Sequence, residues 1–182
     1  MTIMNGTAHF SANGREIGLT MADFWKWAYS DLSNHLQRTM LAEYIVASAL
    51  NIAEKKCNRT NKVQASYDLL TKDGFRITIK SAAYIQSPEA EHPDCISFSI
   101  MSPPGQNRRC SDIYIFCLYK GMAENDSPLN LDLWEFYVIK SSVLDEKKPT
   151  QKTITLPSLM RLQPLWCDYY GISEAIQTTM NA

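Results

Sequence analysis

The sequence predicts an α+β or α/β fold in which one mixed central β-sheet is flanked by helices. Apolar residues recur at helical spacing in the first third of the chain, whereas in the middle third they alternate or run in short stretches. Helical patterns return near the end. An order of helices, strands and then short helices is typical of a sheet with helices packed on its faces.

Composition restricts the class of protein before any motif is considered. The 182 residues are 45% hydrophobic and 20% charged, which fits a single globular domain over residues 1–182. No apolar stretch is long enough for a membrane span. The 5 cysteines are odd in number and form no C-x-x-C pair, which argues against a disulfide framework and a zinc ribbon. Without a signal-peptide pattern at its start, the chain is expected in the reducing cytoplasm.

The first elements are a leader and a short helix. Residues 1–19 are expected to form an irregular leader, and Thr20 can cap a helix over residues 21–29. Trp25 and Trp27 lie two apart in this helix and cannot both face the same core. We therefore expect one of them at an interface or beneath the leader.

A longer helix is expected from Ser33 or Asn34 to about Lys56. Its apolar residues form two rows at helical spacing, which predicts a mostly buried helix. Glu43 lies in its middle. The rows are Leu36, Met40, Ala47 and Leu50 with Leu41, Ile45, Ala49 and Ile52.

The period then changes to two, which indicates strands. Residues 65–70 and 75–82 are joined by Thr71-Lys72-Asp73-Gly74, and Asp-Gly between two such runs predicts a hairpin. The continuously apolar run over residues 113–118 indicates a strand covered on both faces. The other expected elements are strands at 95–101, 113–119 and 134–139, and helical segments at 141–146, 157–162 and 172–180.

Charge is unevenly distributed although the formal net charge is only −1. From Lys55 to Lys80 there are seven basic and two acidic residues, whereas from Ser81 to Glu135 there are three basic and eight acidic ones. The basic stretch could face a DNA phosphate backbone. The alternative is a solvated helix end and hairpin.

Three polar side chains gather on the expected hairpin. Asp68 lies in its first strand, and Thr78 and Lys80 share one face of the second. Antiparallel pairing can bring such positions close together. A carboxylate beside a lysine suits metal-assisted phosphodiester cleavage, because carboxylate oxygens hold Mg²⁺ and the ammonium stabilises developing negative charge.

This arrangement resembles the core motif of the PD-(D/E)XK nuclease superfamily, whose members have the restriction-endonuclease-like fold. In that motif an Asp is followed, after a gap, by Glu or Asp, any residue, and Lys. Tyr67-Asp68 matches the first acid, and Lys80 in Ile77-Thr78-Ile79-Lys80 matches the lysine. A helix before the strands often carries a further Glu in this fold, and Glu43 lies at that place.

The resemblance implies an Mg²⁺-dependent DNA endonuclease. Asp68 with Glu43 would bind the metal, Lys80 would position the water, and Gln86 would be an additional catalytic-site residue. Site-specific cutting of both strands would require a homodimer. Thr78 is the departure from the motif, because it occupies the second acid position and a neutral hydroxyl is a weaker Mg²⁺ ligand than a carboxylate.

Other interpretations stay open. Glu43, or less plausibly Asp73, could replace the missing acid. Without a replacement, the chain would be a catalytically silent module of the same fold that binds nucleic acid or serves in assembly. In a third interpretation the fold is unrelated, Asp68 and Lys80 form a structural ion pair, and Gln86 is a surface amide.

Overall fold

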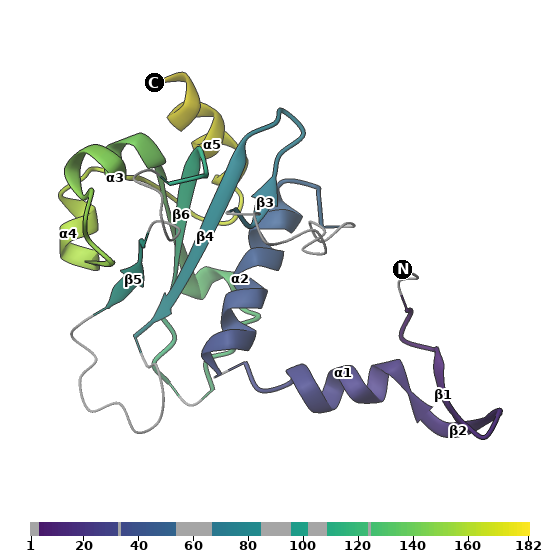
Figure 1. Ribbon diagram of the computed structural model, residues 1–182. Coiled ribbons are helices and arrows are strands. Elements are labelled where there is room, and N and C mark those ends of the chain that lie inside the picture. The colour runs from purple at the N-terminus through teal and green to yellow at the C-terminus, as the bar shows by residue number, and fades with distance from the viewer. Residues whose placement is uncertain (1–3, 33, 54–66, 85–95, 102–108, 124) are drawn as a thin grey trace.

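A mixed five-stranded sheet forms the centre of the described molecule (Figure 1). The computed structural model describes residues 4–32, 34–53, 67–84, 96–101, 109–123 and 125–182. Strands β4 and β6 are parallel, and the other neighbouring pairs in this sheet are antiparallel. In sheet order the strands are β3 (Leu69–Leu70), β4 (Arg76–Ala83), β6 (Ile113–Tyr119), β7 (Trp134–Lys140) and β9 (Leu165–Cys167). This sheet and its helices confirm the predicted mixed α+β class.

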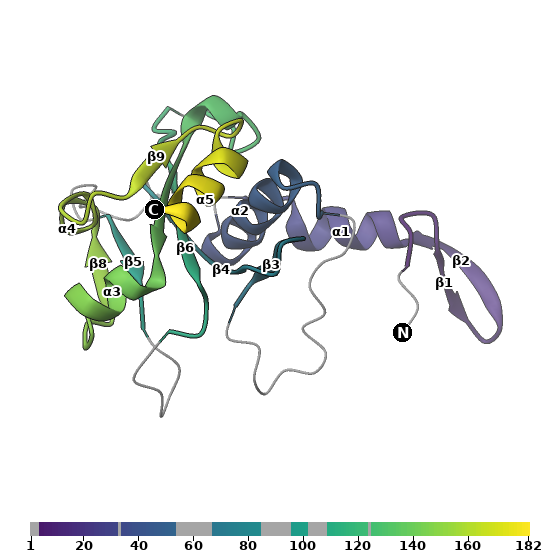
Figure 2. The same ribbon diagram turned by 90° about the horizontal axis from the view of Figure 1, so that it is seen from above.

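Both faces of the sheet are covered, as Figure 2 shows. One face packs against α2 (His35–Ala49) and α5 (Ile172–Asn181). The other faces α3 (Ser141–Lys147), α4 (Leu156–Met160) and a small antiparallel sheet of β5 (Ser97–Ser99) and β8 (Thr153–Thr155). Every residue of β6 is buried between these two layers, so the prediction of a strand covered on both faces is confirmed.

Local sequence explains where α2 begins and ends. The Asn34 side chain accepts a hydrogen bond from the Leu36 backbone N–H at 2.8 Å and thereby caps the first turn. The helix ends at Ala49, and Asn51 follows in the left-handed region at φ 54°. The expected extension to Lys56 is therefore wrong for residues 50–53, and residues 54–56 lie outside the described ranges.

Most of α2 is covered, as expected for a mostly buried helix, but one side of it is exposed. Ala42, Ile45 and Val46 lie in the core between α2 and the sheet. On another side of the helix, however, the side chains of Leu36 and Tyr44 are 70% and 61% exposed. One apolar stripe is enough to dock a helix on a sheet, so a second stripe is not buried by the fold itself.

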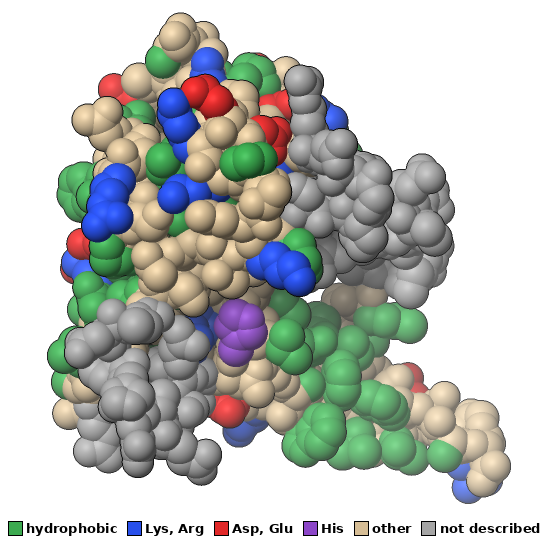
Figure 3. All heavy atoms as spheres, turned by 60° about the vertical axis from the view of Figure 1, so that its left-hand side comes forward, with side chains coloured by type: hydrophobic (Ala, Val, Ile, Leu, Met, Phe, Trp, Pro, Cys, Tyr) green, Lys and Arg blue, Asp and Glu red, His purple; other side chains and the backbone are tan. Residues whose placement is uncertain are grey.

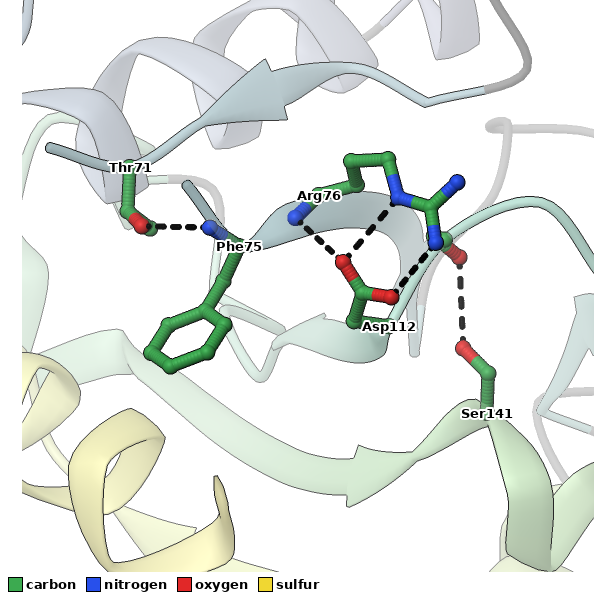
Figure 4. A network of polar contacts seen from close by, with 6 residues as sticks. Thr71, Phe75, Arg76, Asp112 and Ser141 are labelled. Atoms are coloured by element: carbon green, nitrogen blue, oxygen red, sulfur yellow. Dashed lines mark hydrogen bonds and ion pairs between the residues drawn. The ribbon is translucent and has the colours of Figure 1, made fainter. Parts of the chain in front are cut away.

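The hairpin between β3 and β4 forms where the sequence predicts it. The Thr71 hydroxyl accepts a hydrogen bond from the Phe75 backbone N–H at 3.0 Å, as Figure 4 shows. Gly74 takes φ 86°, which its lack of a side chain allows. The first strand is only two residues long, and residues 65–66 of its expected range are not described.

Arg76 fixes the start of β4 against the start of β6 (Figure 4). The Asp112 carboxylate accepts hydrogen bonds from the Arg76 backbone N–H at 2.8 Å, from Nε at 3.0 Å and from Nη2 at 2.6 Å. Next to it, the hydroxyls of Ser111 and Ser141 lie 3.3 Å apart and join this corner to α3. The register of the parallel pair is thus held by side chains as well as by its ladder.

The N-terminal residues form an ordered arm, which corrects the expectation of an irregular leader. Strands β1 (His9–Ala12) and β2 (Arg15–Thr20) pair antiparallel and lead into α1 (Met21–Tyr29). Asn13-Gly14 connects them with φ of 51° and 73°, both in the left-handed region that a tight hairpin turn requires. We call residues 4–32 the N-terminal arm, and Figures 1 and 2 show it projecting from the rest of the molecule.

The remaining elements follow the predicted order with different bounds. Within the described part of the expected strand, residues 96–101, the structure has only β5. Strands β8 and β9 and the 3₁₀ turn η2 (Leu131–Leu133) were not predicted. Each of these is three residues long, too short for periodicity to indicate. No helix in the described part of the chain has the length and apolar character to span a membrane.

Candidate functional site

A cleft of about 430 Å³ lies beside β4, next to the start of β3. We call it the edge cleft. Strand β3 pairs with β4 only through Leu69 and Leu70. The lining residues come from one helix and three extended segments: His35, Thr39, Glu43, Asp68, Ile79, Lys80, Ser81, Ser97 and Ser99. The cleft therefore contains Glu43, Asp68 and Lys80, which the sequence places in three different elements.

Asp68 is positioned by the backbone of β4. Its own N–H donates to the Ile77 carbonyl at 2.8 Å, and its Oδ2 accepts from the Ile79 N–H at 2.8 Å. The carboxylate thus continues the hydrogen bonding to β4 just before β3 begins at Leu69. This double attachment places the acid within one residue of Lys80.

Glu43 reaches the cleft from α2. His35, Thr39 and Glu43 are four residues apart in turn, so they share one side of the helix. Glu43 is buried, with 8% of its surface exposed. A buried acid requires polar or charged partners, and this one faces a cleft lined by polar groups.

Glu43 and Asp68 also border a second hollow, of about 230 Å³. Its other lining residues are apolar or aromatic: Met40, Tyr44, Ala47, Ile52, Ala53 and Leu69. The two carboxylates thus separate an apolar pocket from the polar edge cleft. Such a boundary suits a ligand with one apolar and one charged part.

Lys80 comes to the cleft from the opposite face of the sheet. Its cross-strand partner on β6 is Phe116, which belongs to the core beneath β5 and β8. Lys80 is half-buried, and Ser97 and Ser99 of β5 line the cleft beside it. The edge cleft is therefore bordered by α2 on one side of the sheet and by β5 on the other.

Thr78 does not line the edge cleft. It is buried, with 5% exposure, and pairs with Tyr114 of β6. Its Oγ1 is buried without a hydrogen-bond partner in the structure. At this position the motif expects an acid, and here the chain has a buried neutral hydroxyl.

The other predicted residues are separate from the cleft or not described. Asp73, the less plausible replacement acid, accepts a hydrogen bond from Gln177 of α5 at 3.0 Å and is absent from the cleft lining. Arg76 is engaged by Asp112. Gln86 and the basic residues between 55 and 62 lie outside the described ranges.

The cleft also contains residues that the sequence analysis did not single out. His35 and Thr39 precede Glu43 at spacings of four, and Ser97 and Ser99 alternate along β5. The sequence signal that could have identified them is the spacing of these polar residues, which matches the helical period on α2 and the strand period on β5.

The donor set fits a hard divalent cation such as Mg²⁺. Two carboxylates with serine and threonine hydroxyls offer oxygen ligands, and Mg²⁺ typically uses one or two carboxylates while keeping several waters. Within the described residues no group of three or more His, Cys, Asp or Glu side chains could hold a metal.

In the comparisons with known proteins, no protein-family model matches this chain and no match was found among the curated proteins.

Proposed function

We propose that this protein is a Mg²⁺-dependent DNA endonuclease of the restriction-endonuclease-like type, with its site in the edge cleft. The observation that supports this proposal is the meeting of Glu43, Asp68 and Lys80 in one cleft. Glu43 comes from helix α2, Asp68 from the residue just before β3, and Lys80 from β4, the next strand along the chain. The resemblance of the sequence to the nuclease motif implies the same three elements.

Each side chain has a defined chemical task in this proposal. Glu43 and Asp68 would hold Mg²⁺, which when bound supplies Lewis-acid polarisation of the scissile phosphate. Lys80 would donate to a phosphate oxygen and stabilise the negative charge that develops during hydrolysis. The hydrogen bond from the Ile79 N–H fixes the orientation of the Asp68 carboxylate at the cleft.

The buried Thr78 favours a second candidate, a catalytically silent DNA-binding module with the same fold. One carboxylate fewer than the motif requires lowers the negative charge available to a cation. The cleft would then bind a phosphate through Lys80 without cutting it. Salt dependence identifies this mode, because phosphate contact releases counterions from DNA.

The test is cleavage of plasmid and linear DNA by the folded protein with Mg²⁺ or Mn²⁺. If the cleft is the active site, Lys80→Ala should reduce cleavage by about 100-fold or more. Lys72→Ala is the matched control, because Lys72 is exposed on the hairpin turn and does not line the cleft. Equal loss in both variants would contradict the assignment.

A second pair of variants separates the two candidates. Thr78→Glu restores a carboxylate at the second acid position of the motif, two residues before Lys80, and Thr78→Gln adds a similar volume without the charge. Because Thr78 is buried and does not itself line the cleft, far-UV circular dichroism must first show that both variants fold. A silent module descended from a nuclease should gain metal-dependent cleavage only in Thr78→Glu. If wild type and variants neither cut DNA nor bind it in a salt-dependent way, both candidate functions are wrong.

A further inference from the structure

The N-terminal arm is a folded segment with almost no buried side chains. Helix α1 has no buried residue, and every residue of β1 and β2 except Thr20 is exposed. A nine-residue helix and a two-stranded hairpin are each marginal in water on their own. The arm therefore needs a covering surface to stay folded as the structure shows it.

Local interactions nevertheless define the arm well. The Thr20 hydroxyl accepts a hydrogen bond from the Asp23 N–H at 3.3 Å, and Asp23 Oδ2 accepts from the Thr20 N–H at 2.8 Å, which forms a capping box. Trp25 packs over Gly6, where an added Cβ would lie 3.3 Å from the indole ring. These interactions fix the first half of α1 against the residues that precede it.

The other side of α1 presents an aromatic cluster to solvent. Phe24 lies 6.4 Å from Trp27 and 6.3 Å from Tyr29, measured between ring centroids. Trp27 is 84% exposed. Tryptophan and tyrosine are the residues most enriched among those that dominate binding energy at protein interfaces.

The exposed apolar surface continues from the arm onto α2. Leu36, Met40 and Tyr44, four residues apart in turn, form an exposed row on that helix. Figure 3 shows hydrophobic side chains gathered along the arm and beside its junction with the body. On the arm, the exposed large apolar residues are Met4, Phe10, Ile17, Leu19, Phe24, Trp25, Trp27 and Tyr29.

The area matches half of a stable interface. Six of these eleven side chains are aromatic, and a whole aromatic side chain covers about 150–250 Å². Summed over all sides of the arm and over the α2 row, the exposed parts of the eleven amount to roughly 1,000 Å². A standard interface buries about 800 Å² on each partner. Monomeric proteins rarely expose continuous apolar patches of more than a few hundred Å².

We propose that a second copy of this chain covers this surface, in a two-fold symmetric dimer. The arm of each copy would lie along the exposed α2 row of the other, so that one symmetry operation covers both arms. This dimer does not depend on the proposed nuclease activity.

The charges of the arm favour this occupant. A nucleic acid or a membrane surface would require a basic stripe, whereas the arm has nearly balanced charges and its copies do not repel each other. The basic residues of the described arm are Arg15 and Lys26, and the acidic ones are Glu16, Asp23 and Asp31.

Sedimentation velocity of the full chain at micromolar concentration tests the proposal. The wild type should sediment as a dimer of twice the 20.7 kDa chain mass. Trp27→Glu on the arm and Leu36→Glu on α2 should each weaken dimerisation by about 30-fold or more. Tyr170→Glu is the control, because Tyr170 is 90% exposed and lies outside both apolar surfaces.

Three outcomes would overturn the proposal. They are a monomeric wild type, a dimer that persists in both glutamate variants, and equal weakening by Tyr170→Glu. Far-UV circular dichroism identifies any variant that fails to fold. In that event Trp27→Phe provides a second test. The difference between the fluorescence of the wild type and that of this variant isolates the emission of Trp27. Dilution of the wild type should shift that emission to the red, because dissociation exposes Trp27 to water. An unshifted emission would also contradict the dimer.

Discussion

The Asp68 carboxylate accepts the backbone N–H of Ile79 at 2.8 Å, so this acid is held by the strand that carries Lys80. The bond has a structural role and a chemical one. It satisfies the N–H of Ile79, which lies beyond the residues that β3 pairs with, and it places a carboxylate in the edge cleft. Changes at Asp68 can separate these two roles.

Asp68→Ala should destabilise the protein more than Asp68→Asn. Alanine leaves the Ile79 N–H without its acceptor, which costs about 1–3 kcal/mol at a partly buried site. Asparagine keeps a carbonyl oxygen at the same place and loses only the charge. Urea unfolding measures the difference, and both variants should lose the proposed metal-dependent cleavage. Equal stabilities would show that the bond contributes little.

Thr78→Val should increase stability. The Thr78 hydroxyl is buried without a hydrogen-bond partner in the structure, and valine has nearly the same shape without that polar atom. We expect a gain of about 1 kcal/mol in the free energy of unfolding, since burying an unpaired hydroxyl is unfavourable. Thr78→Ala is the control, because it also removes the methyl group and should destabilise. A clear loss in Thr78→Val would show that the hydroxyl is bonded in solution.

Arg109→Ala should be the most destabilising of these changes. The Arg109 side chain is 1% exposed and donates to Asp145 Oδ1 at 2.7 Å, to the Ile100 carbonyl at 3.0 Å and to the Lys148 carbonyl at 3.1 Å. Its removal leaves a carboxylate and two carbonyls without these partners, at a cost of about 3–5 kcal/mol. Arg109→Lys retains the charge and should fall between alanine and wild type in denaturant midpoint.

Asp112 should contribute to the acid sensitivity of the fold. The hydrogen bonds from Arg76 lower the pKa of Asp112 below its ordinary value, outweighing a smaller opposing effect of burial. A carboxylate with a lowered folded-state pKa stabilises the protein above its unfolded-state pKa, and this contribution disappears as pH falls through the folded value.

Comparison with Asp112→Asn isolates this effect. Between about pH 5 and pH 2 the wild type should lose about 1 kcal/mol or less beyond what the variant loses, because the pair is partly exposed. The measurement is the free energy of unfolding against pH for both proteins. Parallel curves would contradict the assigned role of Arg76.

Local chemistry made much of the fold predictable. Three of the signals involve neighbours within a few positions in the chain. They are the alternation before Asp73-Gly74, the helix cap at Asn34 and the continuous apolar run over residues 113–118. The short strands β8 and β9 have no such pattern, and their pairing depends on partners far along the chain. The hairpin turn at Asn13-Gly14 carried a signal that the sequence analysis passed over.

The candidate site divides in the same way. Asp68, Lys80 and Glu43 could be selected from residue type and spacing alone. Their meeting in one cleft with His35 and the β5 serines could not be predicted. It depends on where β3 begins along β4 and on which layer lies beside that part of β4. The burial of Thr78 likewise follows from packing between β4 and β6.

The sequence by itself determined the class of fold, the main helices and strands, and the residue types available for chemistry. These depend on hydrophobic period, turn residues and caps, which act over a few residues. Only the tertiary structure decided which acids share a cleft and which apolar residues stay exposed, among them Trp27 on α1 and Leu36 on α2. The physical reason is that burial and proximity arise from contacts between segments distant in the chain.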